Sequence, residues 1–223
     1  MNKVFHNLIG EFARLELSGK HFVIGKVVDI GIDLIVVCRG ADYIYIPLLH
    51  MKNIRIAEKD EMDMELQESL PGIVLEENLS LRKVLNNAKG MFVELYVTGN
   101  EAIHGYITSI LNNYFVFYSP IYKTMYIPLN HFKWLIPYQS NQRPYGLNNQ
   151  EFPVRPISAA VARSFEVQIE KLKNKLVIFN LGENGAVIGK LNGVVDNMVE
   201  LETAREKILY LNLQHIKTVH MIS

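Results

Sequence analysis

The sequence predicts an all-β-dominated protein built from three tandem small barrels. Three observations predict this class: a motif that recurs three times, short runs of alternating apolar and polar residues rich in Val, Ile, Tyr and Phe, and Gly, Asn, Asp and Lys between these runs. Hydrophobic residues make up 49% of the 223 residues, too large a share for a largely disordered chain. We therefore expect a folded, β-rich chain.

Each copy of the motif has a glycine inside an apolar run and ends with a tyrosine, a histidine five residues later, and a lysine two residues after that. The glycine and the histidine lie 25, 26 and 26 residues apart in the three copies. The second residue after the tyrosine is proline in two copies and Asn212 in the third. We expect equivalent structural roles at these positions, which are Gly25, Gly105, Gly189, Tyr45, Tyr126, Tyr210, Pro47, Pro128, His50, His131, His215, Lys52, Lys133 and Lys217.

Each copy is expected to form five short antiparallel strands. Residues 39–42, 120–123 and 205–207 are predicted hairpin connections between the third and fourth strands. Short helices are predicted ahead of the strands, at about residues 3–12, 79–88 and 163–173, where apolar residues fall at helical spacing. A short helix followed by five strands matches the Sm-like or SH3-like small barrel.

Two connectors divide the chain into repeats. The barrels are predicted at 1–57, 78–138 and 163–223, with connectors at 58–77 and 139–162. The first connector has eight acidic residues and one lysine, which favours a solvated linker over a helix with Met62, Leu66 and Leu70 on one face. The second is rich in Pro, Asn and Gln and is predicted to be an extended crossover. Because each repeat is small, we expect the three to pack on one another as a compact pseudo-threefold body.

The charge balance names no partner class. The chain has 23 Lys+Arg and 23 Asp+Glu, and outside residues 58–77 the counts are 22 and 15, an excess spread thinly over the barrels. The acidic connector is expected to lie across these mildly basic barrels or to bind a basic partner. No apolar run approaches the roughly 18–20 residues of a membrane helix. The first residues do not match a secretory signal peptide, so an intracellular protein is expected.

The recurring histidines and glycines allow two interpretations each. His50, His131 and His215 could meet as a metal site, but ligands normally come with carboxylates around them and none recurs nearby. We therefore favour histidines that occupy equivalent bends and bond to the backbone of their own repeat, with no metal or cofactor. The three glycines could admit a ligand, and we favour instead a role in bending the strand.

RNA binding is the main alternative to a structural role. RNA binding by an Sm-like barrel is suggested by Arg39, Asp42 and Tyr43 in an Arg-Gly-Ala-Asp-Tyr turn, and by tyrosines that could stack on bases, which are Tyr43, Tyr45, Tyr114 and Tyr122. Only the first repeat has this turn and no strongly basic patch is evident, so nucleic acid is not the favoured partner.

An enzymatic role is not expected. No local Ser/His/Asp or Cys/His arrangement occurs, and the single cysteine, Cys38, lies in an apolar run where a buried, inert thiol is expected. Trp134 is expected to pack at the last strand of the middle repeat, with a partner contact as the alternative.

The triple motif, with its Tyr-x-x-x-x-His-x-Lys ending and the Phe5-His-Asn-Leu-Ile-Gly10 approach, resembles spore coat protein B and its relatives in endospore-forming bacteria. The resemblance covers nearly the whole chain. It implies a non-enzymatic scaffold of the spore coat, which assembles with other coat proteins, first in the mother-cell cytoplasm during sporulation and then in the coat. Two features of that family differ in this sequence. The Ser/Lys/Arg-rich tail is lacking, and other residues replace the Gly-Gly-Pro-Glu-Ser type turn between the first and second strands.

Unpaired edge strands offer the expected mechanism of assembly. A small barrel can extend its sheet from one repeat to the next, or to another chain, through main-chain hydrogen bonds. Self-association through such edges is therefore part of the hypothesis, together with docking of other coat proteins.

Overall fold

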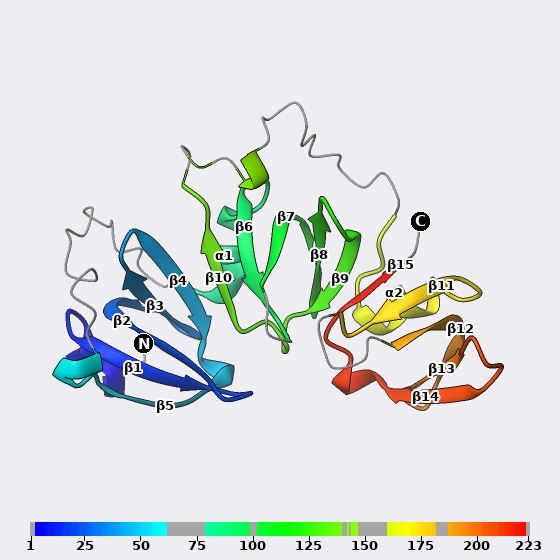
Figure 1. Ribbon diagram of the computed structural model, residues 1–223, viewed down its shortest axis with the longest axis horizontal. Helices are drawn as coiled ribbons and strands as arrows, with labels where there is room; N and C mark the ends of the chain where they lie inside the picture. The colour runs from blue at the N-terminus through cyan, green and yellow to red at the C-terminus, as the bar shows by residue number, and fades with distance from the viewer. Residues whose placement is uncertain are drawn as a thin grey trace. The chain divides into compact units, whose positions relative to one another are not determined.

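The computed structural model describes residues 3–61, 79–98, 102–139, 142, 144–146, 160–181 and 187–221 (Figure 1). Strands dominate the described chain, and the named strands pair antiparallel throughout. The all-β-dominated prediction is therefore confirmed. The chain divides into two compact units, one of Met1–Ala88 with Lys133–Ser140 and one of Lys89–Phe132 with Asn141–Ser223.

Unit 1 holds six strands, in the sheet order β10-β4-β3-β2-β1-β5. Its core is formed by inward-facing residues of these strands, among them Leu15, Val27 and Ile44. The elements are η1 (Lys3–Leu8), β1 (Phe12–Leu17), β2 (His21–Ile30), β3 (Leu34–Arg39), β4 (Asp42–Pro47), η2 (Leu48–His50), β5 (Met51–Ile56), η3 (Lys59–Glu61), α1 (Leu81–Asn87) and β10 (Trp134–Pro137).

Unit 2 holds nine strands, in the order β14-β13-β12-β11-β15-β9-β8-β7-β6. One of its buried clusters joins Tyr114 and Tyr126 to Phe165, Phe179 and Leu201. The elements are β6 (Phe92–Tyr96), β7 (Ile103–Ile110), β8 (Tyr114–Ser119), β9 (Lys123–Pro128), η5 (Pro144–Gly146), α2 (Phe165–Glu170), β11 (Leu176–Phe179), β12 (Val187–Val195), β13 (Met198–Glu202), β14 (Ile208–Asn212), η6 (Leu213–His215) and β15 (Val219–Met221).

Alternation along the sequence decides which side chains enter the core. In β1, Ala13, Leu15 and Leu17 are buried, while Arg14 and Glu16 between them are partly exposed. This is the period-two pattern of a strand with one face on a core. The long second strand of each copy also has a bulge at the same place, which skips Val28, Thr108 or Asn192. A bulge bends its strand and strengthens the twist, so these strands curl.

The predicted hairpins between third and fourth strands are confirmed as β3–β4, β8–β9 and β13–β14. The helix predictions are confirmed in place but were too long: α1 and α2 are shorter, and the first segment is a 3-10 helix that ends at Leu8, because β1 already begins at Phe12. Most of the acidic connector and of the second connector lies outside the described residues, including Met62, Leu66 and Leu70.

Candidate interaction surfaces

The second and third motif copies are joined in unit 2 by strand pairing. β15, the last strand of the third copy, pairs with β9, the fourth strand of the second, with Val219 opposite Tyr126 and His220 opposite Met125. These four side chains are at most 5% exposed. On its other side β15 pairs with β11 of its own copy. One strand therefore continues the sheet from one copy into the next, and we call this contact the β9–β15 junction.

The same kind of contact occurs in unit 1. β10, the fifth strand of the second copy, pairs with β4, the fourth strand of the first, with Leu135 opposite Tyr45. Leu135 is fully buried, and Gln139 Nε2 donates a hydrogen bond to the Ala41 carbonyl at 3.1 Å. Fourth-to-fifth strand pairing therefore recurs at two places in one chain.

A second contact accompanies each pairing, at the turn between the second and third strands of a copy. Asp33 Oδ1 accepts the Leu81 N–H at 2.7 Å, and Asn113 Oδ1 accepts the Phe165 N–H at 2.9 Å. These N–H groups begin α1 and α2, the helices that precede the next copy. Because the first N–H groups of a helix lack partners within it, an acceptor in the turn satisfies them and fixes the helix.

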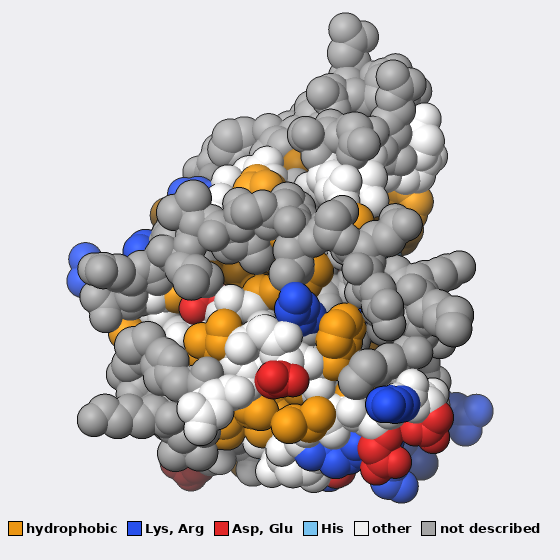
Figure 2. Space-filling view, turned by 90° about the vertical axis from the view of Figure 1, so that its left-hand side faces the viewer, with side chains coloured by type: hydrophobic (Ala, Val, Ile, Leu, Met, Phe, Trp, Pro, Cys, Tyr) orange, Lys and Arg blue, Asp and Glu red, His pale blue; other side chains and the backbone are white. Residues whose placement is uncertain are grey.

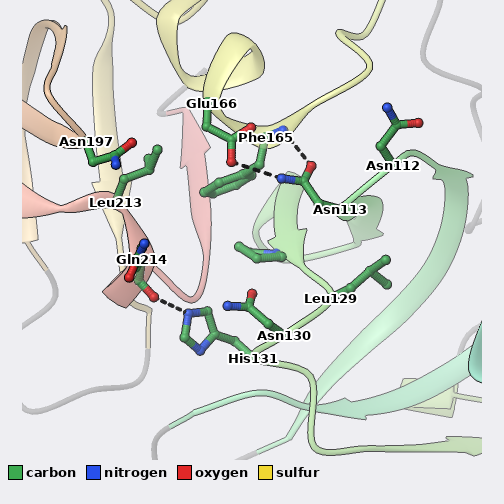
Figure 3. A pocket seen from close by; sticks show the side chains of 11 residues that line it. Asn112, Asn113, Leu129, Asn130, His131, Phe165, Glu166, Asn197, Leu213 and Gln214 are labelled. Atoms are coloured by element: carbon green, nitrogen blue, oxygen red, sulfur yellow. Dashed lines mark hydrogen bonds between the residues drawn. The ribbon is translucent and has the colours of Figure 1, made fainter. Parts of the chain in front are cut away.

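A polar cleft of about 390 Å³ lies beside this turn in unit 2 (Figure 3). In it the His131 ring points to the Gln214 carbonyl, with 2.7 Å between Nε2 and O. Asn113 Nδ2 donates to Glu166 Oε1 at 3.0 Å. The lining residues are Asn112, Asn113, Pro128, Leu129, Asn130, His131, Phe165, Glu166, Asn197, Leu213 and Gln214.

The chemistry of this cleft is that of neutral hydrogen bonding. Amide side chains supply donors and acceptors, and the lining includes a single carboxylate, that of Glu166. The lining residues include neither a paired carboxylate nor a nucleophile beside a base. Within the described ranges, no group of three or more His, Cys, Asp or Glu side chains could hold a metal ion.

The three histidines occupy equivalent bends after the fourth strand, as expected. His50 and His215 end the 3-10 segments η2 and η6, and His131 lies in the corresponding turn. His50 Nδ1 lies 3.0 Å from Ser18 Oγ. His131 differs from the expectation of a bond within its own repeat, because its Nε2 lies 2.7 Å from the Gln214 carbonyl oxygen of the third copy. The β9–β15 junction explains this difference, because it brings η6 next to the His131 turn.

The three recurring glycines face the backbone of the neighbouring strand. A Cβ atom would stand 2.5 Å from the Cys38 carbonyl oxygen at Gly25, 2.1 Å from that of Tyr118 at Gly105 and 2.8 Å from that of Glu202 at Gly189. Such distances are too short for any side chain. The space is therefore filled by protein and offers no room for a ligand.

The other recurring positions differ in their surroundings. Tyr126 is 5% exposed and Tyr210 is 58% exposed, because β9 has a neighbour on both sides. Pro47 and Pro128 end their strands, and Asn212 in the third copy accepts the Gln214 N–H at 2.9 Å. The lysines also diverge: Lys52 pairs with Glu16 at 3.2 Å, Lys217 Nζ donates to Thr98 at 3.3 Å, and Lys133 lies beside Gly19.

The residues proposed for RNA binding differ in their burial, and the fully buried Tyr114 offers no stacking surface. Arg39 and Asp42 face each other across the β3–β4 turn, and Tyr43 packs against the buried Leu34 cluster. The prediction that Tyr114 could stack on a base is wrong, because its ring is fully buried and its hydroxyl donates to the Ala162 carbonyl at 2.6 Å. Burial raises the pKa of Tyr114 to about 12.

Charged groups on unit 1 are mixed in sign. Glu61 accepts hydrogen bonds from Arg55 and Arg14, and the Arg55 guanidinium above all lowers the pKa of Glu61 to about 2. Figure 2, which faces the side drawn at the left of Figure 1, shows basic and acidic side chains side by side and hydrophobic ones close to them. The described residues of this face therefore mix both signs of charge and do not form a basic patch of the kind that nucleic acids require.

Cys38 and Trp134 lie as the sequence predicts. Cys38 is 6% exposed, and burial raises the pKa of its thiol, which suits an inert thiol. Trp134 packs against the unit 1 core, with its ring edge-on to that of His21 and 6.0 Å between the ring centroids.

None of the helices in the described part of the chain is long and apolar enough to cross a membrane.

The sequence did not point to the turn acceptors Asp33 and Asn113, and although it suggested sheet extension between repeats, it did not predict which strands pair there. A signal was present for the turns, since a residue with a short carbonyl-bearing side chain stands between the second and third strands of every copy, at Asp33, Asn113 and Asn197. The unequal exposure of the three equivalent tyrosines had no counterpart in the sequence.

Comparison with known proteins supplies three similarities. A family model described as the third domain of YwrJ matches residues 164–219. The chain is 41% identical over 209 residues to "Uncharacterized protein YwrJ" of Bacillus subtilis (strain 168), which is 92% of this chain and 93% of that protein. It is 26% identical over 141 residues to "Spore coat protein B" of the same organism, which is 63% of this chain and 35% of that protein.

Proposed function

The chain belongs to the YwrJ family, and we propose that it is a non-enzymatic scaffold component of the bacterial spore coat that acts through protein–protein assembly. Its partners are other spore coat proteins and further copies of itself. It is made in the mother-cell cytoplasm during sporulation and then joins the coat.

The coat assignment is supported by the similarity to spore coat protein B, a relative whose name states its location. That similarity includes about three fifths of the present chain. It agrees with the threefold Tyr-x-x-x-x-His-x-Lys motif, on which the resemblance to that family depends.

The proposed architecture is three tandem Sm-like or SH3-like barrels of five strands, each with a short preceding helix. The strand order β5-β1-β2-β3-β4 in unit 1 supports it, since the fifth strand lies beside the first. The third copy has the same neighbours, with β15 beside β11. A bulge three residues after each recurring glycine bends the second strand, as closure into a small barrel requires.

The observation that carries the scaffold role is the β9–β15 junction. It joins two copies by main-chain strand pairing and buried side chains. Strand addition of this kind gives affinity through the backbone and selectivity through side-chain pockets. A protein that already joins its own repeats in this way is suited to join other chains.

Localisation tests the proposal directly. We expect a fluorescent fusion of the full chain, expressed from its own promoter in its sporulating host, to collect at the forespore surface and to fractionate with the coat of released spores. The reporter alone, expressed at the same level, serves as the control and should stay diffuse. A fusion that stays diffuse in the mother cell throughout sporulation would contradict the coat assignment.

A further inference from the structure

Among the described residues, the fourth strand of the third copy, β14, lacks the second neighbouring strand that the other two fourth strands have. β4 pairs with β10 and β9 pairs with β15, whereas β14 is the last strand of its sheet among the described residues and pairs there with β13. Three successive large side chains on it are exposed: Ile208 at 47%, Leu209 at 36% and Tyr210 at 58%. An exposed apolar edge of this kind is a template for another strand.

The first copy has the complementary edge. β5, its fifth strand, pairs with β1 and is the other terminal strand among the described residues. Ile56 on it is 56% exposed, and Ile54 is partly buried against the unit 1 core. The described part of the chain therefore has one fourth strand and one fifth strand at the ends of the sheet order, and these are the two strand types that pair at both existing junctions.

The register of the existing junctions predicts which residues would meet. Leu135 and Val219 each stand four residues after the motif histidine, and they lie opposite Tyr45 and Tyr126. The equivalent residue of β5 is Ile54 and the equivalent tyrosine is Tyr210. Antiparallel pairing in this register sets Ile54 opposite Tyr210 and Ile56 opposite Ile208, which are aromatic–aliphatic and aliphatic pairs of the kind that stabilise sheets.

The backbone groups agree with this register. Thr203 N–H donates to the Lys207 carbonyl and Leu213 N–H to the Asn197 carbonyl, at 2.9 and 2.8 Å. Because bonded and unbonded pairs alternate along an antiparallel ladder, the main-chain groups of Ile208 and Tyr210 point away from β13.

The same argument applies to β5. Ala57 N–H donates to the Phe12 carbonyl at 2.8 Å, so the main-chain groups of Ile54 and Ile56 point away from β1. In the predicted register, therefore, the residues of β5 that lie opposite residues of β14 are those whose main-chain N–H and C=O groups face the edge.

We propose that β14 of one chain pairs with β5 of a second copy of this chain, with Tyr210 opposite Ile54 and Ile208 opposite Ile56. The inference rests on the proposed scaffold function and names its partner and its surface. The contact is heterologous, because two different edges meet, so repetition gives rings if the rotation closes and open filaments if it does not.

Cross-linking of the full-length protein tests the pairing and its register. One chain carries Ile208→Cys and the other Ile56→Cys, and the native Cys38 is buried and does not compete. Directly opposed strand residues have Cα atoms about 5.5 Å apart, within the range that a disulfide spans. We expect a mixed disulfide dimer on oxidation. The matched control pairs the Ile208→Cys chain with Ile32→Cys, which is 57% exposed but lies off the β5 edge, and should give background only.

Assembly of the unlinked protein gives the second measurement. We expect the mass of the wild type in solution to rise with concentration, and Ile208→Lys with Tyr210→Lys to raise the concentration of half-assembly by about tenfold or more. The control, Val167→Lys with Val195→Lys, changes residues that are 54% and 67% exposed away from this edge and should assemble as the wild type does.

Three outcomes would overturn the inference. One is a protein that stays monomeric at all concentrations, and a second is equal cross-linking in the control pair. The third is a disulfide within single chains that carry both Ile208→Cys and Ile56→Cys, which would show that the edges close on each other in one molecule. Coat localisation of the fusion is a separate measurement. A fusion that reaches the coat without this strand pairing would overturn the pairing alone, and pairing without coat localisation would contradict the proposed function alone.

Discussion

At the scale of single residues, the recurring glycines explain why the motif repeats at nearly constant spacing. Each stands in the curled second strand, three residues before the bulge, where the carbonyl of the third strand fills the place of a side chain. The sequence predicted a bend at these positions. The contact with a particular carbonyl could not be predicted, because it depends on how closely two strands approach.

We predict that alanine at these positions destabilises the protein in the order of the overlap. Gly105→Ala, whose Cβ would stand 2.1 Å from a backbone oxygen, should cost the most, and Gly189→Ala, at 2.8 Å, the least. Overpacking of this kind costs about 1–3 kcal/mol in free energy of unfolding. Chemical denaturation of the three single variants measures the order, and equal losses would show that the close approach is not what selects glycine.

At the scale of elements, β15 depends on contacts that its own sequence does not reveal. It is only three residues long, yet it lies between β9 and β11 with Val219 fully buried. Its neighbour His220 is 5% exposed with a buried Nδ1 atom, and its ring lies 6.1 Å from that of Tyr122. Burial lowers the pKa of His220, since a charged imidazole would lose its hydration there.

We predict that this histidine makes unit 2 sensitive to acid. Above the unfolded pKa of about 6.5 the imidazole is neutral in both states, and as pH falls below that value the unfolded state binds a proton more readily than the folded state. Stability should therefore decrease between pH 7 and pH 5, by at most about 1.4 kcal/mol per pH unit. Denaturation followed by circular dichroism at several pH values measures this loss.

The matched variants for this measurement are His220→Leu and His215→Leu. Leucine at 220 removes the buried proton-binding group and should flatten the pH dependence over this range. His215 is exposed, so leucine there should leave the dependence in place. An unchanged pH profile in His220→Leu would contradict the assignment.

At the scale of the whole molecule, the chain divides into two compact units whose bounds differ from those of the three motif copies. The fifth strand of the second motif copy belongs to unit 1, while its other strands belong to unit 2. Each unit has its own buried cluster, represented by Leu15 in unit 1 and Leu201 in unit 2. The chain contains a single tryptophan, Trp134, which packs in unit 1 and so reports on that unit alone.

We predict that the two units unfold separately. Leu15→Ala should lower the unfolding midpoint seen by Trp134 fluorescence, with a cost of about 2–5 kcal/mol for a buried leucine. Leu201→Ala is the matched change in unit 2. It should leave the fluorescence midpoint in place and lower the midpoint seen by circular dichroism. Equal shifts by both probes in both variants would mean that the units unfold as one.

The sequence by itself determined the β class, the threefold motif, the hairpins and the places of the helices, because these depend on local alternation, turn residues and spacing. Only the tertiary structure decided which strand of one copy pairs with which strand of another, because an edge takes its partner from distant parts of the chain. Three equivalent tyrosines show this difference. Tyr45, Tyr126 and Tyr210 occupy the same motif position, and only the neighbouring strand decides that Tyr126 is buried while Tyr210 remains exposed.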